Sequence, residues 1–407
     1  MEQLALDGGT PVRTAPFPPR VQFGDEEVEL TTRALRSQNL FGPSGTMVAE
    51  LERSFAELYG VQYAISSTSG TACLHVAVAG LNPEPGDEII VGPITDAGSL
   101  IPILWQNCVP VFADLGEHYN MDPAEVERQI TPRTRAIMAI NLFGNPCDME
   151  GMVQVAQRHG LALIEDCSQA HMTQYRGRLL GTFGDVGCFS FQQSKHMTTG
   201  EGGMTVTNDP HLAQRMRLFT DKAWPREPGA RCYEFLGMNY RMTELQGAVG
   251  VAQVKKVAAV TDRRHELGEA LSDGIRDLPG LRPAPVTPGG RHTYWLYPLL
   301  TEAWPAQRFA EALGAEGVPA GWGYTGVPIY LCMRPLVEKV LFGSSHHPLD
   351  GCHGGRVLDY GPGLCPRAEA TLPRTVTLSL HEGYSEQDLA DMAAAIRKVA
   401  EGLPPAE

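Results

Sequence analysis

The sequence predicts an α/β fold, with a large domain on a mostly parallel seven-stranded sheet and a smaller C-terminal α/β domain. Its 407 residues exceed one ordinary hydrophobic core and, at roughly 150 residues per domain, fit two or three units. With 43% hydrophobic and 20% charged residues, the composition is that of a packed globular protein. From about residue 61 to 208, short apolar runs alternate with amphipathic or glycine-punctuated segments, which is typical of strand–helix repetition.

Seven short apolar runs are the candidate strands of the large domain. They are Tyr63–Ser66, Glu88–Val91, Val109–Ala113, Ala136–Asn141, Ala162–Asp166, Gly187–Phe191 and Gly203–Thr207. Between them, Thr71–Ala79 and Met149–His159 have helical patterns. Strands that alternate with helices in this way favour a parallel sheet with helices on both faces.

A long polar-amphipathic stretch, Val251–Ile275, predicts a connecting helix, and turns rich in proline and glycine follow it. We place the domain boundary here. The large domain then occupies residues 1–260, and the small domain residues 261–407. The elements expected in the small domain are two strands and a final helix, at Tyr294–Leu300, Thr375–Ser379 and Glu386–Glu401.

Charge and composition argue against several classes of partner. A net charge of -14 without any block of Lys or Arg disfavours nucleic acid. The first 20 residues lack the pattern of a secretory signal, and no apolar run approaches the ~18 residues of a membrane span. We therefore expect a cytoplasmic protein that does not bind membranes.

The cysteines and histidines do not form a standard metal pattern. Nine cysteines are scattered without C-x-x-C spacing, which favours reduced thiols. His346, His347, Cys352 and His353 cluster in sequence, but their spacing matches no standard zinc pattern and they lie among Gly, Ser and Pro. We expect a loop there and no metal site.

Three segments carry residues suited to catalysis. Lys195 lies just past an apolar strand, where active sites of open α/β sheets are found, although most lysines are surface charges. Asp166 ends another strand and could pair with a protonated ring nitrogen or simply cap a turn. Ser66–Ala72 leads from strand into helix, so that it forms either a phosphate cradle or an ordinary helix cap.

The order and spacing of these segments resemble the DegT/DnrJ/EryC1/StrS family of sugar and cyclitol aminotransferases over nearly the whole chain. The matching pieces are FGP at 41–43, SGTACLHVA at 69–77, EDCSQAH at 165–171, GDVGCFSFQQSKHMTTGEGG at 184–203 and LGMNYRMTELQGA at 236–248. The resemblance implies the type I fold of pyridoxal 5'-phosphate (PLP) enzymes and a homodimer. It also implies PLP as the cofactor, bound mainly by the large domain.

The resemblance assigns roles by position. Lys195 is the lysine that holds PLP as a Schiff base, and Asp166 is the carboxylate that faces the pyridine nitrogen. Gln169 matches a contact to the cofactor ring. Asn239 and Arg241 fall in a segment that reaches the neighbouring subunit's site, which implies shared active sites. The remaining cofactor-binding positions, mostly for the phosphate, are Gly70, Thr71, Ala72, Ala97 and Ser190.

Some positions depart from the family pattern. Ala97, or Asp96 beside it, stands where the family places an aromatic residue against the cofactor ring. Gln192 replaces a frequent histidine of nucleotide-sugar enzymes and matches some cyclitol and aminohydroxybenzoate enzymes. Trp295 also stands at a position that is often histidine. These changes point away from the commonest nucleotide-sugar subgroup.

The resemblance implies an aminotransferase that moves nitrogen from glutamate or glutamine to a keto-sugar or keto-cyclitol, as in antibiotic biosynthesis. Two alternatives stay open. One is a dehydrating or aromatising enzyme similar to aminohydroxybenzoate synthase, and the other is a non-catalytic regulator that binds PLP. An intact set of Lys195, Asp166 and Gln169 argues against the regulator.

Overall fold

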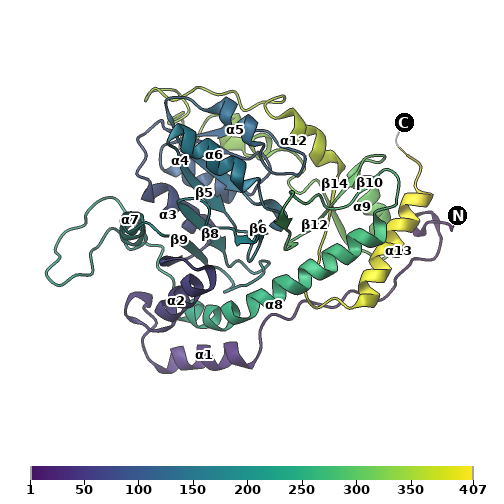
Figure 1. Ribbon diagram of the computed structural model, residues 1–407, viewed down its shortest axis with the longest axis horizontal. Helices are drawn as coiled ribbons and strands as arrows, with labels where there is room; N and C mark the ends of the chain where they lie inside the picture. Colours follow the sequence, from purple (N-terminus) through teal and green to yellow (C-terminus); the bar gives the residue numbers. More distant parts are fainter. Residues whose placement is uncertain (1, 406–407) are drawn as a thin grey trace.

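A computed structural model describes residues 2–405 of the chain. Its large domain is built around a seven-stranded sheet (Figure 1). In order across the sheet, the strands are β1 (Tyr63–Ser67), β9 (Gly203–Thr207), β8 (Val186–Ser190), β5 (Ala162–Asp166), β4 (Thr134–Ile140), β2 (Glu88–Val91) and β3 (Val109–Phe112). All neighbouring pairs are parallel except those of β9, which is antiparallel to β1 and to β8. The predicted fold class is confirmed.

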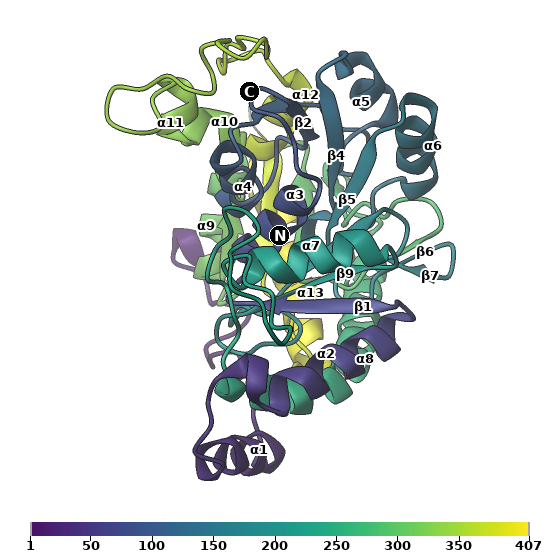
Figure 2. The same ribbon diagram turned by 90° about the vertical axis from the view of Figure 1, so that its left-hand side faces the viewer.

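Helices cover both faces of this sheet, and Figure 2 shows helices on either side of β4 and β5. One face packs against α3 (Gly70–Gly80), α4 (Ile101–Trp105) and α7 (Pro210–Thr220). The other packs against α2 (Met47–Tyr59), α5 (Pro123–Gln129), α6 (Met149–His159) and the first half of α8 (Glu244–Ile275). The strands are apolar throughout because successive residues enter opposite cores: Ile89 packs on the α3 side and Ile90 on the α2 side.

The small domain has a four-stranded antiparallel sheet covered by helices. Its strands are β10 (Leu281–Arg282), β12 (Tyr297–Thr301), β14 (Thr375–Leu378) and β13 (Ala320–Trp322), in that order. Its main helices are α9 (Ala306–Ala315), α13 (Glu386–Gly402) and the second half of α8.

Shorter elements complete the described chain. The helix α1 (Asp25–Arg36) packs on α8. A three-stranded sheet contains β11 (Gly290–Arg291), β6 (Gln174–Tyr175) and β7 (Arg178–Leu179). The remaining short helices are α10 (Ile329–Cys332), α11 (Arg334–Val337) and α12 (Pro366–Thr371). Single 3-10 turns occur at Ala5–Asp7, Gly42–Ser44, Ala97–Ser99, Leu142–Gly144 and Leu372–Arg374.

Two predicted elements have different starting points in the structure. The connecting helix begins at Glu244, because Thr243 and Gln246 form a capping box just before it. The strand expected from Tyr294 is β12, which begins at Tyr297, because the φ of 47° at Tyr294 is incompatible with a strand.

The expected domain boundary at residue 260 lies inside α8, a helix of 32 residues. Val251 and Val257 of this helix pack in the large domain, and Leu267 and Leu271 pack in the small one. The two domains therefore share one continuous element. No helix within residues 2–405 combines the length and the apolar character needed to cross a membrane.

Candidate active site

A cavity of about 400 Å³ lies at the carboxyl ends of β4, β5 and β8. This is the edge at which open α/β sheets bind their ligands. The large domain provides its floor, and Trp295 and Tyr324 of the small domain close one side. Residues predicted to bind the cofactor and found in this lining are Gly70, Thr71, Asp166, Gln169, Ser190 and Lys195.

One end of the cavity is the N-terminus of α3. Ser69 caps the helix by accepting a hydrogen bond from Ala72 N at 3.0 Å. Ala72 N–H is thereby engaged, and Ala72 does not line the cavity, so its phosphate contact stays a prediction. A Cβ at Gly70 would lie only 2.6 Å from Ser190 Cβ, so that the close approach of these two elements requires glycine. The helix start offers N–H groups and a positive dipole end to an anion.

Asp166, the last residue of β5, lines the cavity and is 5% exposed. Its Oδ2 accepts a hydrogen bond from Ser99 Oγ at 2.8 Å, and its Oδ1 accepts one from Ser168 N at 3.0 Å. Because the Ser99 proton is directed to Asp166, the 2.7 Å contact between Thr95 Oγ1 and Ser99 Oγ must be donated by Thr95. This chain of hydroxyls fixes the carboxylate in one orientation.

The amine of Lys195 enters the same cavity. Its Nζ lies 3.7 Å from the ring centroid of Trp295, which is within the range of a cation–π contact. Burial lowers the pKa of Lys195 to about 8, against the opposing charges of Asp166 and Asp96. A substantial fraction of this amine is therefore neutral near physiological pH, the form in which an amine acts as a nucleophile or a base.

Gln169 joins the floor of the cavity to its small-domain wall. Its Oε1 accepts a hydrogen bond from Phe143 N at 2.8 Å, and its Nε2 donates to Tyr324 Oη at 3.0 Å. Tyr324 also packs edge-on against Phe143 and Trp295. The cavity thus has an aromatic wall that the sequence pattern did not reveal.

Asp96 and Ala97 stand where the family usually places an aromatic residue against the cofactor ring. Asp96 lines the cavity and accepts a hydrogen bond from Gly98 N at 2.8 Å, which caps the 3-10 turn that follows. Ala97 is inside that turn and is absent from the lining, so its place beside the cofactor stays a prediction.

Asn239 and Arg241 do not line this cavity. Arg241 forms an ion pair with Asp221, and Asn239 makes an isolated β-bridge with the same aspartate. Burial favours the neutral form of Asp221, but hydrogen bonds from Arg226 and Arg241 outweigh it and lower its pKa. Within one chain, these two predicted residues are therefore separated from Lys195 and Asp166.

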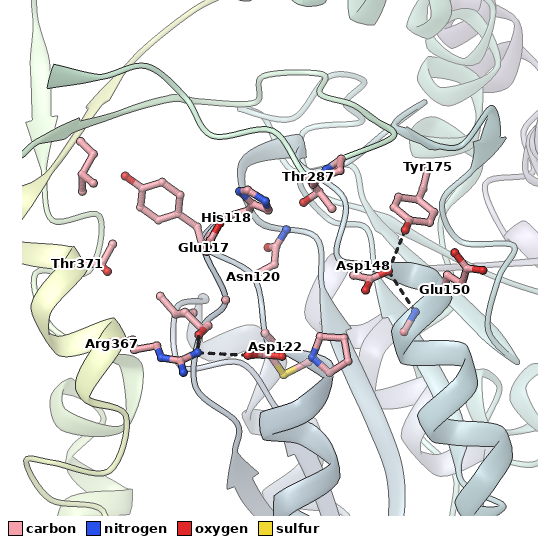
Figure 3. Close-up of a pocket in the computed structure, with 18 of the residues that line it drawn as sticks. Glu117, His118, Asn120, Asp122, Asp148, Glu150, Tyr175, Thr287, Arg367 and Thr371 are labelled. Atoms are coloured by element: carbon pink, nitrogen blue, oxygen red, sulfur yellow. Dashed lines mark hydrogen bonds and ion pairs between the residues drawn. The ribbon is translucent and has the colours of Figure 1, made fainter.

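A larger cavity of about 1090 Å³ lies between the domains (Figure 3). Several of the polar and charged groups that line it are held by neighbouring groups. Arg367 donates to Leu115 O and Asp122, Tyr175 Oη donates to Asp148 at 2.8 Å, and Arg176 pairs with Glu150. It shares no lining residue with the cavity around Lys195, so we do not assign the catalytic site to it.

Comparison with known proteins agrees with the site geometry. The model of the DegT/DnrJ/EryC1/StrS aminotransferase family matches residues 21–340. The chain belongs to this family. An L-glutamine:2-deoxy-scyllo-inosose aminotransferase of Streptoalloteichus tenebrarius is 35% identical, over 97% of both chains.

Two further comparisons mark the breadth of this aminotransferase family. A GDP-perosamine synthase of Caulobacter vibrioides is 39% identical over 62% of this chain and 68% of its own. A solved structure of 3-amino-5-hydroxybenzoic acid synthase superposes with a TM-score of 0.84 at 26% identity, covering 96% of this chain and 100% of that one. The protein is accordingly a PLP-dependent aminotransferase of the DegT/DnrJ/EryC1/StrS family.

The residues of the cavity fit PLP. The start of α3 suits its phosphate, Asp166 suits a protonated ring nitrogen, and Lys195 offers the amine that would hold its aldehyde carbon. The tight contact between Gly70 and Ser190 fits a phosphate cradle, in which backbone must come close to the ligand. When bound, PLP supplies an electron-withdrawing ring that stabilises negative charge at the donor carbon.

Arg20 is a residue of this site that motif comparison missed. Its Nη1 donates to Lys195 O at 2.7 Å, and its Nη2 donates to His196 O at 2.8 Å. Its Nε donates to Glu382 at 2.7 Å, and Glu382 is also held by the buried Arg264 at 2.9 Å. The N-terminal segment and the small domain thereby fix the backbone from which the catalytic amine projects.

We expect Arg20→Met to lower kcat roughly tenfold to 10²-fold with a smaller effect on KM, because a misplaced reacting group loses orientation before it loses binding. Arg20→Lys should recover part of the activity, since an ammonium group can still donate to one of the two carbonyls. Steady-state kinetics and the pH dependence of the bound-cofactor absorbance measure the effect.

Arg13→Met is the matched control for Arg20. Arg13 lies in the same N-terminal segment and pairs with Asp388 and Asp391 at 2.8 Å, away from the catalytic lysine. If both substitutions lower stability and kcat equally, the effect of Arg20 is structural and the positioning role is wrong.

Proposed function

We propose that this enzyme transfers an amino group from glutamine or glutamate to the ketone carbon of a cyclitol or sugar ring. The observation that carries the proposal is the placement of Lys195 and Asp166 in one cavity whose rim is polar. Gln192, Ser194 and Asp96 line that rim, and their amide, hydroxyl and carboxylate groups suit a polyhydroxylated ring.

Asp166 and Lys195 have different roles in the proposed reaction. Asp166, oriented by Ser99 and Ser168, would keep a proton on the cofactor ring nitrogen. Lys195 would hold the cofactor covalently and, once released from it, move a proton at the substrate carbon. Its pKa of about 8 is close to the value that serves both as acceptor and as donor of that proton.

A free cyclitol ketone is favoured over a nucleotide-linked one. Gln192 lines the cavity, at the position where glutamine occurs in some cyclitol enzymes. A relative that matches 97% of the chain is named for a cyclitol ketone.

The test is to purify the enzyme in its pyridoxamine form and to screen keto-cyclitols, free keto-sugars and nucleotide-linked ketoses. Return of pyridoxal absorbance together with an aminated product identifies the acceptor. Loss of water without an aminated product would favour the dehydrating or aromatising alternative. A normal cofactor spectrum with no transfer to any ketone would favour a regulator.

We further propose that the active enzyme is a homodimer with shared sites, and that it works in the cytoplasm. The segment after α7 extends away from the body as a loop (Figure 1). Tyr233 and Leu236 on this segment are 59% and 92% exposed, and they offer apolar surface that a second copy can cover. Since Asn239 and Arg241 lie away from the cavity of their own chain, a second copy can bring them to it.

Mixed dimers test the shared site. A Lys195→Ala chain and an Asn239→Ala/Arg241→Ala chain should each be inactive alone. After subunit exchange, every heterodimer should regain one complete site and about half of the activity of a wild-type dimer, since one site in two is intact. Absence of rescue, with heterodimers confirmed by differential tags, contradicts sharing.

A further inference from the structure

Outside the catalytic cavity, the chain that follows α11 carries a compact group of metal-ligating side chains. His347, Cys352 and His353 place one nitrogen or sulfur atom each within 4.8 Å of one another. They lie beyond residues 21–340, the part matched by the family model, and none of them lines the cavity around Lys195. In Figure 2 this yellow-green chain runs across the top of the molecule.

Hydrogen bonds orient His347 as a ligand would need. Its Nε2 lies 3.0 Å from Asn107 Oδ1, which can only accept, so that Nε2 carries the proton. Its Nδ1 therefore presents a lone pair, and this atom faces Cys352 Sγ at 3.3 Å. A metal-binding histidine is usually fixed in this way, with its other nitrogen donating to an oxygen outside the metal site.

The other two residues are presented by a tight turn. Gly354 N donates to Gly351 O at 2.9 Å, and both glycines have positive φ values, of 78° and 73°. This turn places Cys352 and His353 side by side at its tip. The backbone N–H of Cys352 is further fixed by Asp350 Oδ1 at 3.0 Å.

The turn rests on the large domain. A Cβ at Gly86 would lie 2.8 Å from Cβ of His353, so that the histidine packs directly on the Gly86 backbone. Gly86 and Asn107 are joined by a hydrogen bond of 2.8 Å between their main chains, and they precede β2 and β3. The group is thus seated at the amino ends of the strands, the edge opposite to the catalytic cavity.

We propose that His347, Cys352 and His353 bind a Zn²⁺ ion, with water as the fourth ligand. With Zn–N of about 2.0–2.1 Å and Zn–S of about 2.3 Å, tetrahedral ligand atoms lie about 3.3–3.6 Å apart. The observed 3.3 Å between Nδ1 and Sγ is within about 0.3 Å of the nitrogen–sulfur spacing, and the other ligand atoms lie within 4.8 Å. Imidazole and thiolate together favour zinc over magnesium or calcium. The ion would fasten the loop after α11 to the sheet edge and would take no part in amine transfer.

This proposal reverses the expectation from sequence, and the reason is spatial. The spacing of these residues matches no standard zinc pattern, because the folded turn and not a regular interval brings them together. His346, which adjoins them in sequence, has its Nδ1 bonded to Lys339 O at 2.9 Å and is not in the group.

The test uses full-length holoenzyme stripped with a chelator and then dialysed against Zn²⁺ alone, with bound metal measured by mass spectrometry. One zinc per chain is expected in the wild type. His347→Ala, Cys352→Ser and His353→Ala should each weaken zinc binding at least tenfold, and Asn107→Ala about 10–100-fold. Replacement of zinc by Co²⁺ should give a thiolate-to-cobalt absorption band that Cys352→Ser removes.

His346→Ala and Cys332→Ser are the matched controls, since they remove an adjacent histidine and another exposed cysteine. Both should bind zinc as the wild type does. Zinc content that is unchanged in Cys352→Ser, or a wild type that retains no more zinc than the His347→Ala/Cys352→Ser/His353→Ala variant, would overturn the proposal. Thermal melts of the metal-free variants show whether each one is folded.

Discussion

Lys195→Ala is expected to abolish transamination, with turnover lower by about 10³-fold or more, because the chain loses both its covalent anchor and its proton carrier. Borohydride should trap the cofactor on the Lys195 peptide of the wild type and on no peptide of the variant. Peptide mass mapping after borohydride treatment identifies the lysine that carries the trapped cofactor. In the cofactor-free protein, the rate of PLP attachment should rise as the pH passes about 8, because attachment needs the neutral amine.

Lys255→Ala is the control for Lys195. Lys255 pairs with Glu26 on the surface and should be dispensable for cofactor attachment and turnover. Trapped cofactor on Lys255, Lys222 or any lysine other than Lys195 would contradict the assignment.

Asp166→Asn is expected to keep the fold and part of the bound cofactor but to lower turnover by about 10²-fold or more. An amide cannot hold a pyridinium as an anion does. The amide would also have to turn its oxygen toward either Ser99 or Ser168, and its NH₂ group would face the other donor. Single-turnover kinetics with the donor alone, read from the cofactor absorbance, separate this chemical defect from weaker binding.

Asp185→Asn is the matched control for Asp166. Asp185 also accepts a backbone hydrogen bond, from Leu163 N at 2.8 Å, but it is outside the catalytic cavity. Turnover near that of the wild type in Asp166→Asn, or an equal loss in Asp185→Asn, would mean that the ring nitrogen is served by another group.

The strands and helices of the large domain could be predicted from the sequence because each one has a local pattern of apolar residues. Buried strands such as Ala162–Asp166 are continuous apolar runs, and Met149–His159 has a helical period with a glycine stop. Helix propensity alone does not predict that α8 begins at Glu244. The stretch from Glu244 to Gly250 contains two glycines, and it is helical because those glycines pack closely on Val48 and Leu51 of α2.

The site was predictable where residues adjoin a strand end, as Asp166, Ser190 and Lys195 do. It was not predictable where distant segments meet. Tyr324 and Arg20 reach the cavity or the Lys195 backbone from the small domain and the N-terminal segment, and no periodicity or spacing connects them to it. The sequence pattern left Ala97 and Asp96 open at one position, and the 3-10 turn at Ala97–Ser99 places Asp96 in the cavity lining.

The continuity of α8 has a consequence for how this molecule unfolds. Its 32 residues span about 48 Å at 1.5 Å per residue, and their apolar side chains belong to two cores. If either end of the helix unfolds, the core at that end loses the apolar side chains that the helix contributes to it. Cutting the chain at residue 260 would leave each fragment with half of that helix and an open hydrophobic surface. We therefore expect the two cores to unfold together and not as independent domains.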